Sequence, residues 1–169
     1  KSNPAFYEWL VSPVVYRDDR VFAPAARALF ESYAEPDVMA HHYRAIARGQ
    51  WRSEIEGKDA VKLKKYFYVV RPLLSLAWVE AHGTLPPMSI DRLLAASKMP
   101  ADVRAAIDDL LDAKRRTPEL GRGPRIAALD RWATDMMSAL APSMAPCAPE
   151  RADRRLAAAN QLFKTTARL

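Results

Sequence analysis

Cysteine and long apolar runs are scarce in this sequence, and both absences limit where the protein can work. The single cysteine, Cys147, cannot form a disulfide within the chain, which fits a reducing compartment. No stretch approaches the ~20 uncharged apolar residues that a membrane span needs, and no signal peptide opens the chain. We therefore expect a cytoplasmic protein that does not enter a membrane.

Glycine is also rare, and alternating β-branched residues are few. The 169 residues include five glycines and thirteen prolines, with abundant alanine, leucine and arginine between the prolines. This composition is typical of helices that are separated by proline-bounded turns. We predict an all-α fold, a bundle of about seven to eight helices with a kinked central helix.

The motifs of common catalytic sites are missing as well. The sequence has no glycine-rich phosphate loop, no GxSxG and no CxxC. The pairs Asp18–Asp19 and Asp108–Asp109 do not resemble a two-metal site, because the first is typical of a turn and neighbours on a helix diverge. His41, His42 and His82 lack the spacing of metal ligands. We therefore predict no catalytic residue and no metal ligand here.

Prolines and capping residues predict where successive helices begin along the chain. Asn3 with Pro4, and later Ser89, have the chemistry of helix starts. The expected helices cover residues 4–10, 24–33, a stretch from Pro36 to beyond Trp51, 62–80, a short stretch after Ser89, a stretch that opens at Pro100, 126–140 and 151–167. Because "APSMAPCAPE" reads as a linker, we expect a helical domain over 1–141, a Pro-rich linker over 142–150 and a C-terminal helix over 151–169.

The charge of the chain favours anionic partners. The formal net charge is +6 and the sequence pI is about 9.6. Nucleic acids and nucleotide phosphates are the first candidates for such a chain. An ordinary solvated surface rich in arginine explains the charge equally well.

The expected central helix, "KLKKYFYVVRPLLSLAWVE" at 62–80, is apolar on most sides but carries charge. At 3.6 residues per turn one face holds four polar side chains, which are Lys64, Tyr68, Arg71 and Ser75. Lys62 and Lys65 lie together on another side. Pro72 removes the hydrogen bond to the carbonyl of Tyr68, so we expect the helix to kink or break there.

An arginine in apolar company needs an anionic partner, because an unpaired buried charge costs several kcal/mol. The residues alone favour an internal carboxylate, and the candidates are Glu8, Glu31, Glu54 and Glu56. The alternative is a phosphate, which arginine binds as a fork and lysine as a point charge.

Four stretches carry a family resemblance, in the order "NPAFYEWLVSPVVY", "AHHYRAIAR", "VKLKKYFYVVRPLLSLAWVE" and "LPPMSIDRLL". Together they resemble the C-terminal part of the predicted nucleotidyltransferases associated with RNA ligases, a family similar to the DNA polymerase β superfamily. The likeness spans Asn3 to about Lys114, and "KKYFYVVRPLL" is its most specific element. Because the chain opens at Lys1 on what reads as a helix start, we expect it to be part of a longer protein.

The resemblance implies a two-part enzyme that uses an NTP and Mg²⁺. Its N-terminal α/β domain would hold the metal through an Asp-x-Asp arrangement after a Gly-Ser turn, and neither motif occurs in this sequence. The chain alone is therefore expected to be inactive. The helical part would complete the site for the nucleotide or for an acceptor such as RNA.

Residues that match the family's motifs become the candidates for nucleotide or phosphate binding. The central motif contributes Lys62, Lys65, Tyr66 and Arg71, and "HHY" contributes His42 and Tyr43 as cleft candidates. The polar face of the helix adds Lys64 and Tyr68. The other interpretations are a non-catalytic basic module that binds nucleic acid and a helical interaction domain whose charges only solvate it.

Overall fold

The computed structural model describes residues 4–16, 20–117, 119–139 and 149–166. Eight helices and two short strands occur within these residues. In chain order they are α1 (Pro4–Leu10), α2 (Phe22–Tyr33), α3 (Pro36–Glu54), β1 (Ala60–Lys62), α4 (Lys65–His82), α5 (Ile90–Ala96), α6 (Ala101–Arg116), β2 (Arg122–Pro124), α7 (Ala127–Ser138) and α8 (Pro149–Thr166). The predicted all-α class is confirmed, with one small two-stranded sheet added.

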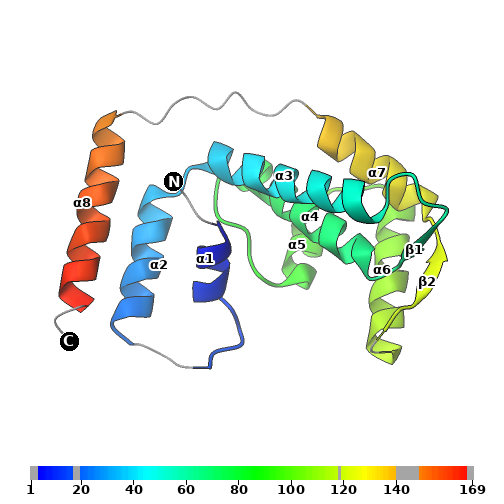
Figure 1. Cartoon of the computed structure of the whole chain (residues 1–169), viewed down its shortest axis with the longest axis horizontal. Helices are drawn as coiled ribbons and strands as arrows, with labels where there is room; N and C mark the ends of the chain where they lie inside the picture. Colours follow the sequence, from blue (N-terminus) through cyan, green and yellow to red (C-terminus); the bar gives the residue numbers. More distant parts are fainter. Residues whose placement is uncertain (1–3, 17–19, 118, 140–148, 167–169) are drawn as a thin grey trace.

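The pair α3 and α4 forms the centre of the fold (Figure 1). Ala47 of α3 and Leu73, Leu74 and Leu76 of α4 are 0 % exposed. Each of these leucines contributes roughly 2 kcal/mol of hydrophobic stabilisation when it leaves water. The helices α5, α6 and α7 extend this core through Leu93, Ile107 and Leu129, whose exposed fractions are at most 1 %.

Chain chemistry explains where several helices begin and end. Pro36 opens α3 at a position where its missing N–H is not needed. The Ser89 hydroxyl accepts a hydrogen bond from the Arg92 N–H, which confirms the predicted cap of α5. Gly83 ends α4 with φ of 62°, in the left-handed region that glycine adopts without strain.

The start of the central helix differs from the prediction. Lys62 lies on β1 and Lys64 precedes the first residue of α4, so the helix begins at Lys65 rather than at Lys62. The helical-wheel argument that placed Lys62 beside Lys65 is therefore wrong. The helix continues through Pro72 without a break.

The two strands join segments that are distant in sequence. They pair antiparallel with the register Ala60↔Pro124, Val61↔Gly123 and Lys62↔Arg122. Val61 is 1 % exposed and anchors the strand in the core, while its neighbours Ala60 and Lys62 face solvent. This ribbon fixes the loop between α3 and α4 against the loop between α6 and α7.

The helices α1, α2 and α8 stand together at the other end of the molecule (Figure 1). The ring of Tyr7 on α1 stacks on Phe30 of α2 at 5.2 Å between centroids. On the other side of α2, α8 packs against it, and Arg155 of α8 forms an ion pair of 3.0 Å with Glu35. None of the described helices is both long and apolar enough to cross a bilayer.

Several predicted features lie outside the described residues. These are the Asn3 cap, the Asp18–Asp19 pair, Cys147, most of the expected linker and the last three residues of the chain. The C-terminal helix is present within the described part and begins at Pro149.

Candidate functional site

A cleft of about 220 Å³ opens beside α1, α3 and α4. Five of its lining residues belong to one face of α4, because they recur at the spacing of helical turns: Phe67, Tyr68, Arg71, Pro72 and Ser75. Ile46 and Gln50 come from α3 together with Tyr43, and Glu8 comes from α1. The cleft thus contains three of the four residues on the predicted polar face.

Arg71 is the cation of this cleft, and it has no carboxylate partner within the described part of the chain. Its Nη2 contacts the carbonyl oxygen of Met88 at 3.4 Å and the Sδ atom of the same residue at 3.1 Å. Both partners are neutral, so they do not compensate the charge of the half-buried guanidinium. An anion that entered the cleft would supply the negative charge that compensates Arg71.

Glu8 lies in the same cleft but is committed to Tyr43. The Tyr43 hydroxyl, buried at 3 % exposure, donates a hydrogen bond of 3.1 Å to Oε1 of Glu8. Burial first, and then the charge of Glu8, raise the pKa of Tyr43 well above its ordinary value, while Arg71 opposes this rise. Tyr43 therefore remains a neutral donor, and the predicted pairing of Arg71 with Glu8 does not occur.

Lys64 and Lys65 have internal carboxylates as partners, outside the cleft lining. Lys64 forms an ion pair of 2.9 Å with Glu119, whose hydrogen bond raises the pKa of the lysine. Lys65 forms one of 2.8 Å with Glu54, and that hydrogen bond lowers the pKa of the carboxyl group. Glu54 was among the predicted internal partners, and Glu119 was not.

Two further candidates, Tyr66 and His42, are not among the residues that line the cleft. Tyr66 is 1 % exposed, and its hydroxyl donates to Oδ1 of Asp130 at 2.8 Å while it accepts from the N–H of Ile126 at 2.9 Å. It therefore ties α4 to the start of α7 rather than opening onto the cleft. The ring of His42 packs edge-on against Tyr43 at 5.6 Å, and burial lowers its pKa.

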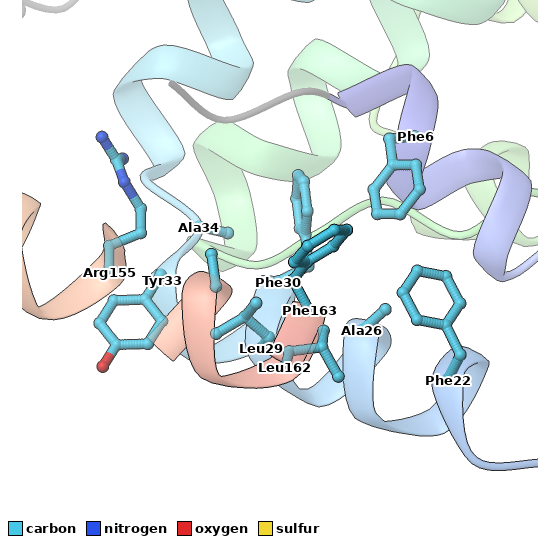
Figure 2. Close-up of a pocket in the computed structure, with 11 residues that line it drawn as sticks. Phe6, Phe22, Ala26, Leu29, Phe30, Tyr33, Ala34, Arg155, Leu162 and Phe163 are labelled. Carbon is cyan, nitrogen blue, oxygen red and sulfur yellow. The ribbon is translucent and has the colours of Figure 1, made fainter. Parts of the chain in front are cut away.

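Two other cavities are less suited to an anion. One of about 290 Å³ lies between α2 and α8 and is lined by aromatic and aliphatic side chains such as Phe6, Phe22 and Leu162 (Figure 2). Its one charged lining residue among those described, Arg155, is already paired with Glu35. Another of about 310 Å³ contains Glu31 and has no lysine or arginine among its described lining residues, so it offers no cation to a phosphate.

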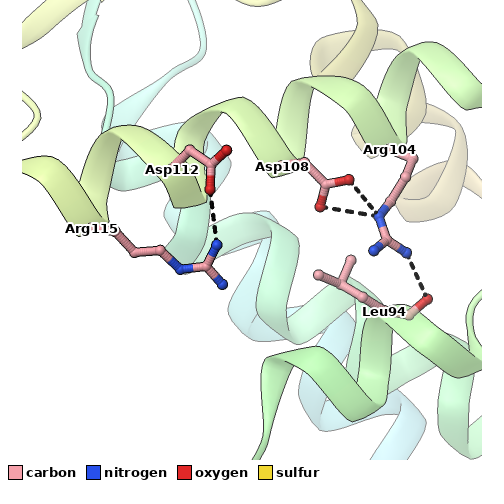
Figure 3. A network of polar contacts seen from close by, with 5 residues as sticks. All are labelled: Leu94, Arg104, Asp108, Asp112 and Arg115. Carbon is pink, nitrogen blue, oxygen red and sulfur yellow. Dashed lines mark hydrogen bonds and ion pairs between the residues drawn. The ribbon is translucent and has the colours of Figure 1, made fainter.

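The acidic residues of α6 do not form a metal site. Arg104 holds Asp108 through two contacts with its Nε and also donates to the carbonyl oxygen of Leu94 (Figure 3). Arg115 holds Asp112 at 2.8 Å. No group of three or more histidine, cysteine or acidic side chains that could hold a metal ion occurs within the described ranges.

A family model described as the RNA repair pathway DNA polymerase beta family, RlaP, matches residues 1–165. The chain belongs to the RlaP family. The predicted resemblance is thereby confirmed over nearly the whole chain rather than only to about Lys114.

A curated relative supports the same assignment. "Uncharacterized protein YcgL" of Bacillus subtilis (strain 168) is 37 % identical over 132 residues, which cover 78 % of this chain and 50 % of the relative. The chain thus spans about half the length of this relative. No solved structure matches the chain.

Sequence reasoning missed one buried charge in this RlaP-family chain. Arg44 of α3 is 2 % exposed and pairs with Glu80 of α4 at 2.8 Å, whereas its Nε and Nη1 find no partner in the described chain. Arg44 directly follows Tyr43 in "AHHYRAIAR". Its burial was not predictable from that motif, because it depends on how α3 packs on α4. The cleft residue Gln50 was missed for the same reason.

Proposed function

We propose that this chain supplies one wall of the nucleotide site of an RlaP-family nucleotidyltransferase, which transfers NMP from an NTP to an acceptor. The observation that carries the proposal is Arg71, a guanidinium that lines a cleft and pairs with no described carboxylate. Family membership supports the polymerase-β-like chemistry. That the donor is an NTP and that the NMP passes to an acceptor are both part of the proposal.

Several polar groups of the cleft have a fitting role. Arg71 would bind phosphate oxygens as a two-pronged donor, the geometry in which arginine binds phosphate best. Tyr68 is 49 % exposed, so its ring has a free surface on which a base can stack. Gln50 would add a hydrogen bond that orients the ligand.

The size of the cleft indicates a partial site. Its volume of about 220 Å³ is below the ~300 Å³ at which small-molecule sites usually begin, so it accommodates one part of a nucleotide. The described residues offer no group of carboxylates for Mg²⁺, and the sequence holds neither Gly-Ser nor Asp-x-Asp. We therefore assign metal binding and activation of the acceptor to a part of the longer protein outside this sequence.

A second candidate function is a non-catalytic basic module that binds nucleic acid or a protein partner. The excess of positive charge favours it, since basic surfaces bind phosphate backbones without any chemistry. The single cysteine is consistent with a cytoplasmic location for either candidate function.

The test of the first proposal compares Arg71→Ala with Lys65→Ala. Equilibrium binding of a fluorescent ATP analogue would be measured with and without Mg²⁺, beside thermal melting of each variant. Loss of a charge-assisted hydrogen bond costs about 1.5–3 kcal/mol, so we expect Arg71→Ala to weaken binding at least roughly tenfold. We expect a smaller effect for Lys65→Ala, because Glu54 already holds that lysine.

Melting temperature separates a binding role from a structural one. Arg71→Lys keeps the charge but loses the fork, so it should lie between the wild type and Arg71→Ala. A folded Arg71→Ala variant that binds the nucleotide like the wild type would contradict the proposed site.

A further inference from the structure

Most of the net charge of this protein belongs to two short segments. Residues 52–65 and 112–125 contain ten basic and five acidic side chains, an excess of five in a chain whose formal net charge is +6. These segments are about fifty residues apart in sequence. Charge counting alone does not show that they meet.

The β-ribbon brings the two segments together. Strand β1 belongs to the first segment and β2 to the second, and their register sets Lys62 opposite Arg122. The helix α6 ends in Lys114, Arg115 and Arg116 directly before the second loop. We call the surface made by the described residues of 52–65 and 112–125 the cationic end, and it lies at the opposite end of the molecule from α8 (Figure 1).

Lysines from both segments lie near Glu119, and lysines of the first segment lie near Glu54. The charges of Lys64, Lys62 and Lys114 all help to lower the pKa of Glu119. Lys65, Lys58 and Lys62 act in the same direction on Glu54. Lys62 and Lys114 form no ion pair with a described residue, so two of these lysines can neutralise an external anion without breaking an internal ion pair.

Two of these lysines each lie over an aromatic ring. Lys65 lies 5.0 Å from the centroid of Tyr68, and Lys114 lies 5.3 Å from that of Phe67. Both rings also line the cleft that contains Arg71. The cationic end and the candidate nucleotide site therefore share a border.

We propose that the cationic end binds the phosphate backbone of a single-stranded polynucleotide and leads that strand past Tyr68 to the Arg71 cleft. Cations spaced along a surface with interleaved aromatic rings suit a single strand, because unstacked bases offer faces for stacking that a duplex hides. The direction of the strand rests on the proposed function, in which the strand is the acceptor. Binding at the cationic end itself does not depend on it.

The experiment uses matched pairs of substitutions in the full chain. Lys62→Gln/Lys114→Gln removes two positive charges from the cationic end, and Arg154→Gln/Lys164→Gln removes two from α8 at the far end. Binding of a fluorescein-labelled 20-nucleotide RNA strand, the same DNA sequence and the corresponding RNA duplex would be followed by anisotropy between 50 and 300 mM salt. Nucleotide binding would be measured on the same samples.

We expect the wild type to bind the single strands more tightly than the duplex. The Lys62→Gln/Lys114→Gln variant should bind the RNA strand roughly tenfold more weakly at 0.1 M salt, and the slope of log K against log salt should fall by about 1.4, or 0.7 per lost contact. The α8 pair should bind like the wild type. Tighter binding of RNA than of DNA would add recognition of the 2′-hydroxyl to the same site.

Three results would overturn the proposal: no strand binding by the wild type, equal weakening by both pairs, or a preference for the duplex. Failure of the nucleotide site looks different, because Arg71→Ala would then leave nucleotide binding unchanged while the lysine pair still weakened strand binding. The two ideas can therefore fail separately.

Discussion

At the scale of single residues, Tyr66 shows how one side chain can fix a junction. Its hydroxyl accepts the N–H of Ile126, the residue before α7, and donates to Asp130 within that helix. Arg125 holds the second oxygen of Asp130 at 2.8 Å. A buried tyrosine thereby satisfies polar groups at the start of α7 that would otherwise be costly to bury.

This environment predicts a pH dependence. Burial, supported by Asp130, raises the pKa of Tyr66 from 10.0 to about 12. The unfolded chain therefore loses this proton first, so the stabilisation is complete below pH 10 and declines as the pH rises towards 12. We expect the free energy of unfolding to fall between pH 9 and pH 11 by about 1.4 kcal/mol more in the wild type than in Tyr66→Phe.

The measurement is urea unfolding at both pH values, with tyrosinate absorbance to follow ionisation. Tyr43, whose pKa is also raised, is present in both proteins and contributes equally. An equal decline in both proteins would mean that Tyr66 ionises as readily in the folded state as in the unfolded chain.

Partners of charged residues were the least predictable feature at this scale. Helical spacing placed Tyr68, Arg71 and Ser75 on one face correctly, because that face depends only on local geometry. It could not identify Glu119 as the partner of Lys64, since a loop 55 residues away carries that carboxylate. Pairing across elements depends on packing, which no local pattern contains.

At the scale of elements, the ribbon explains the wrong start of the central helix. In "AVKLKK" the apolar Val61 and Leu63 alternate with lysines, a period of two that indicates a strand. The run continues without a gap into the helical pattern of α4, so the sequence alone predicts a first helical turn where the strand lies. Its partner "RGP" contains glycine and proline, which are poor strand formers, and gave no signal.

The turn into β2 allows a matched test of backbone conformation. Gly49 lies within α3 and Gly121 precedes β2 with φ of 65°, and an added Cβ would meet no atom within 4 Å at either position. Gly49→Ala should raise the free energy of unfolding by about 0.5–1 kcal/mol through helix propensity. Gly121→Ala should lower it by about 1 kcal/mol, because alanine is strained at positive φ.

Urea unfolding of both variants checks the signs. The carbonyl of Gly121 accepts a hydrogen bond from the N–H of Leu63 at 3.1 Å, so strain at this turn should also loosen the ribbon. Stabilisation by both substitutions would show that the turn adopts another conformation in solution.

At the scale of the whole molecule, the helices differ in how much they contribute to the buried core. The buried core runs from Met39 on α3 to Met137 on α7 and includes none of the α8 residues whose burial is described. The sequence predicted a separate last helix from composition alone, and we propose that α8 is an addition to a helical domain over residues 1–141. Hydrophobic periodicity predicted the order of the helices well, because each amphipathic face is a local property.

This view predicts the effect of deleting residues 140–169. The deletion removes the Arg155–Glu35 ion pair and the apolar contacts on α2, but it keeps all residues that line the Arg71 cleft. We expect the shortened chain to unfold cooperatively and to bind the ATP analogue within about twofold of the full chain, since the core cluster supplies most of the stability. Leu129→Ala in the full chain serves as the comparison, because removal of a buried leucine should cost about 3 kcal/mol. If the deletion abolishes the helical circular dichroism signal or nucleotide binding while Leu129→Ala keeps both, then α8 is an integral part of the domain.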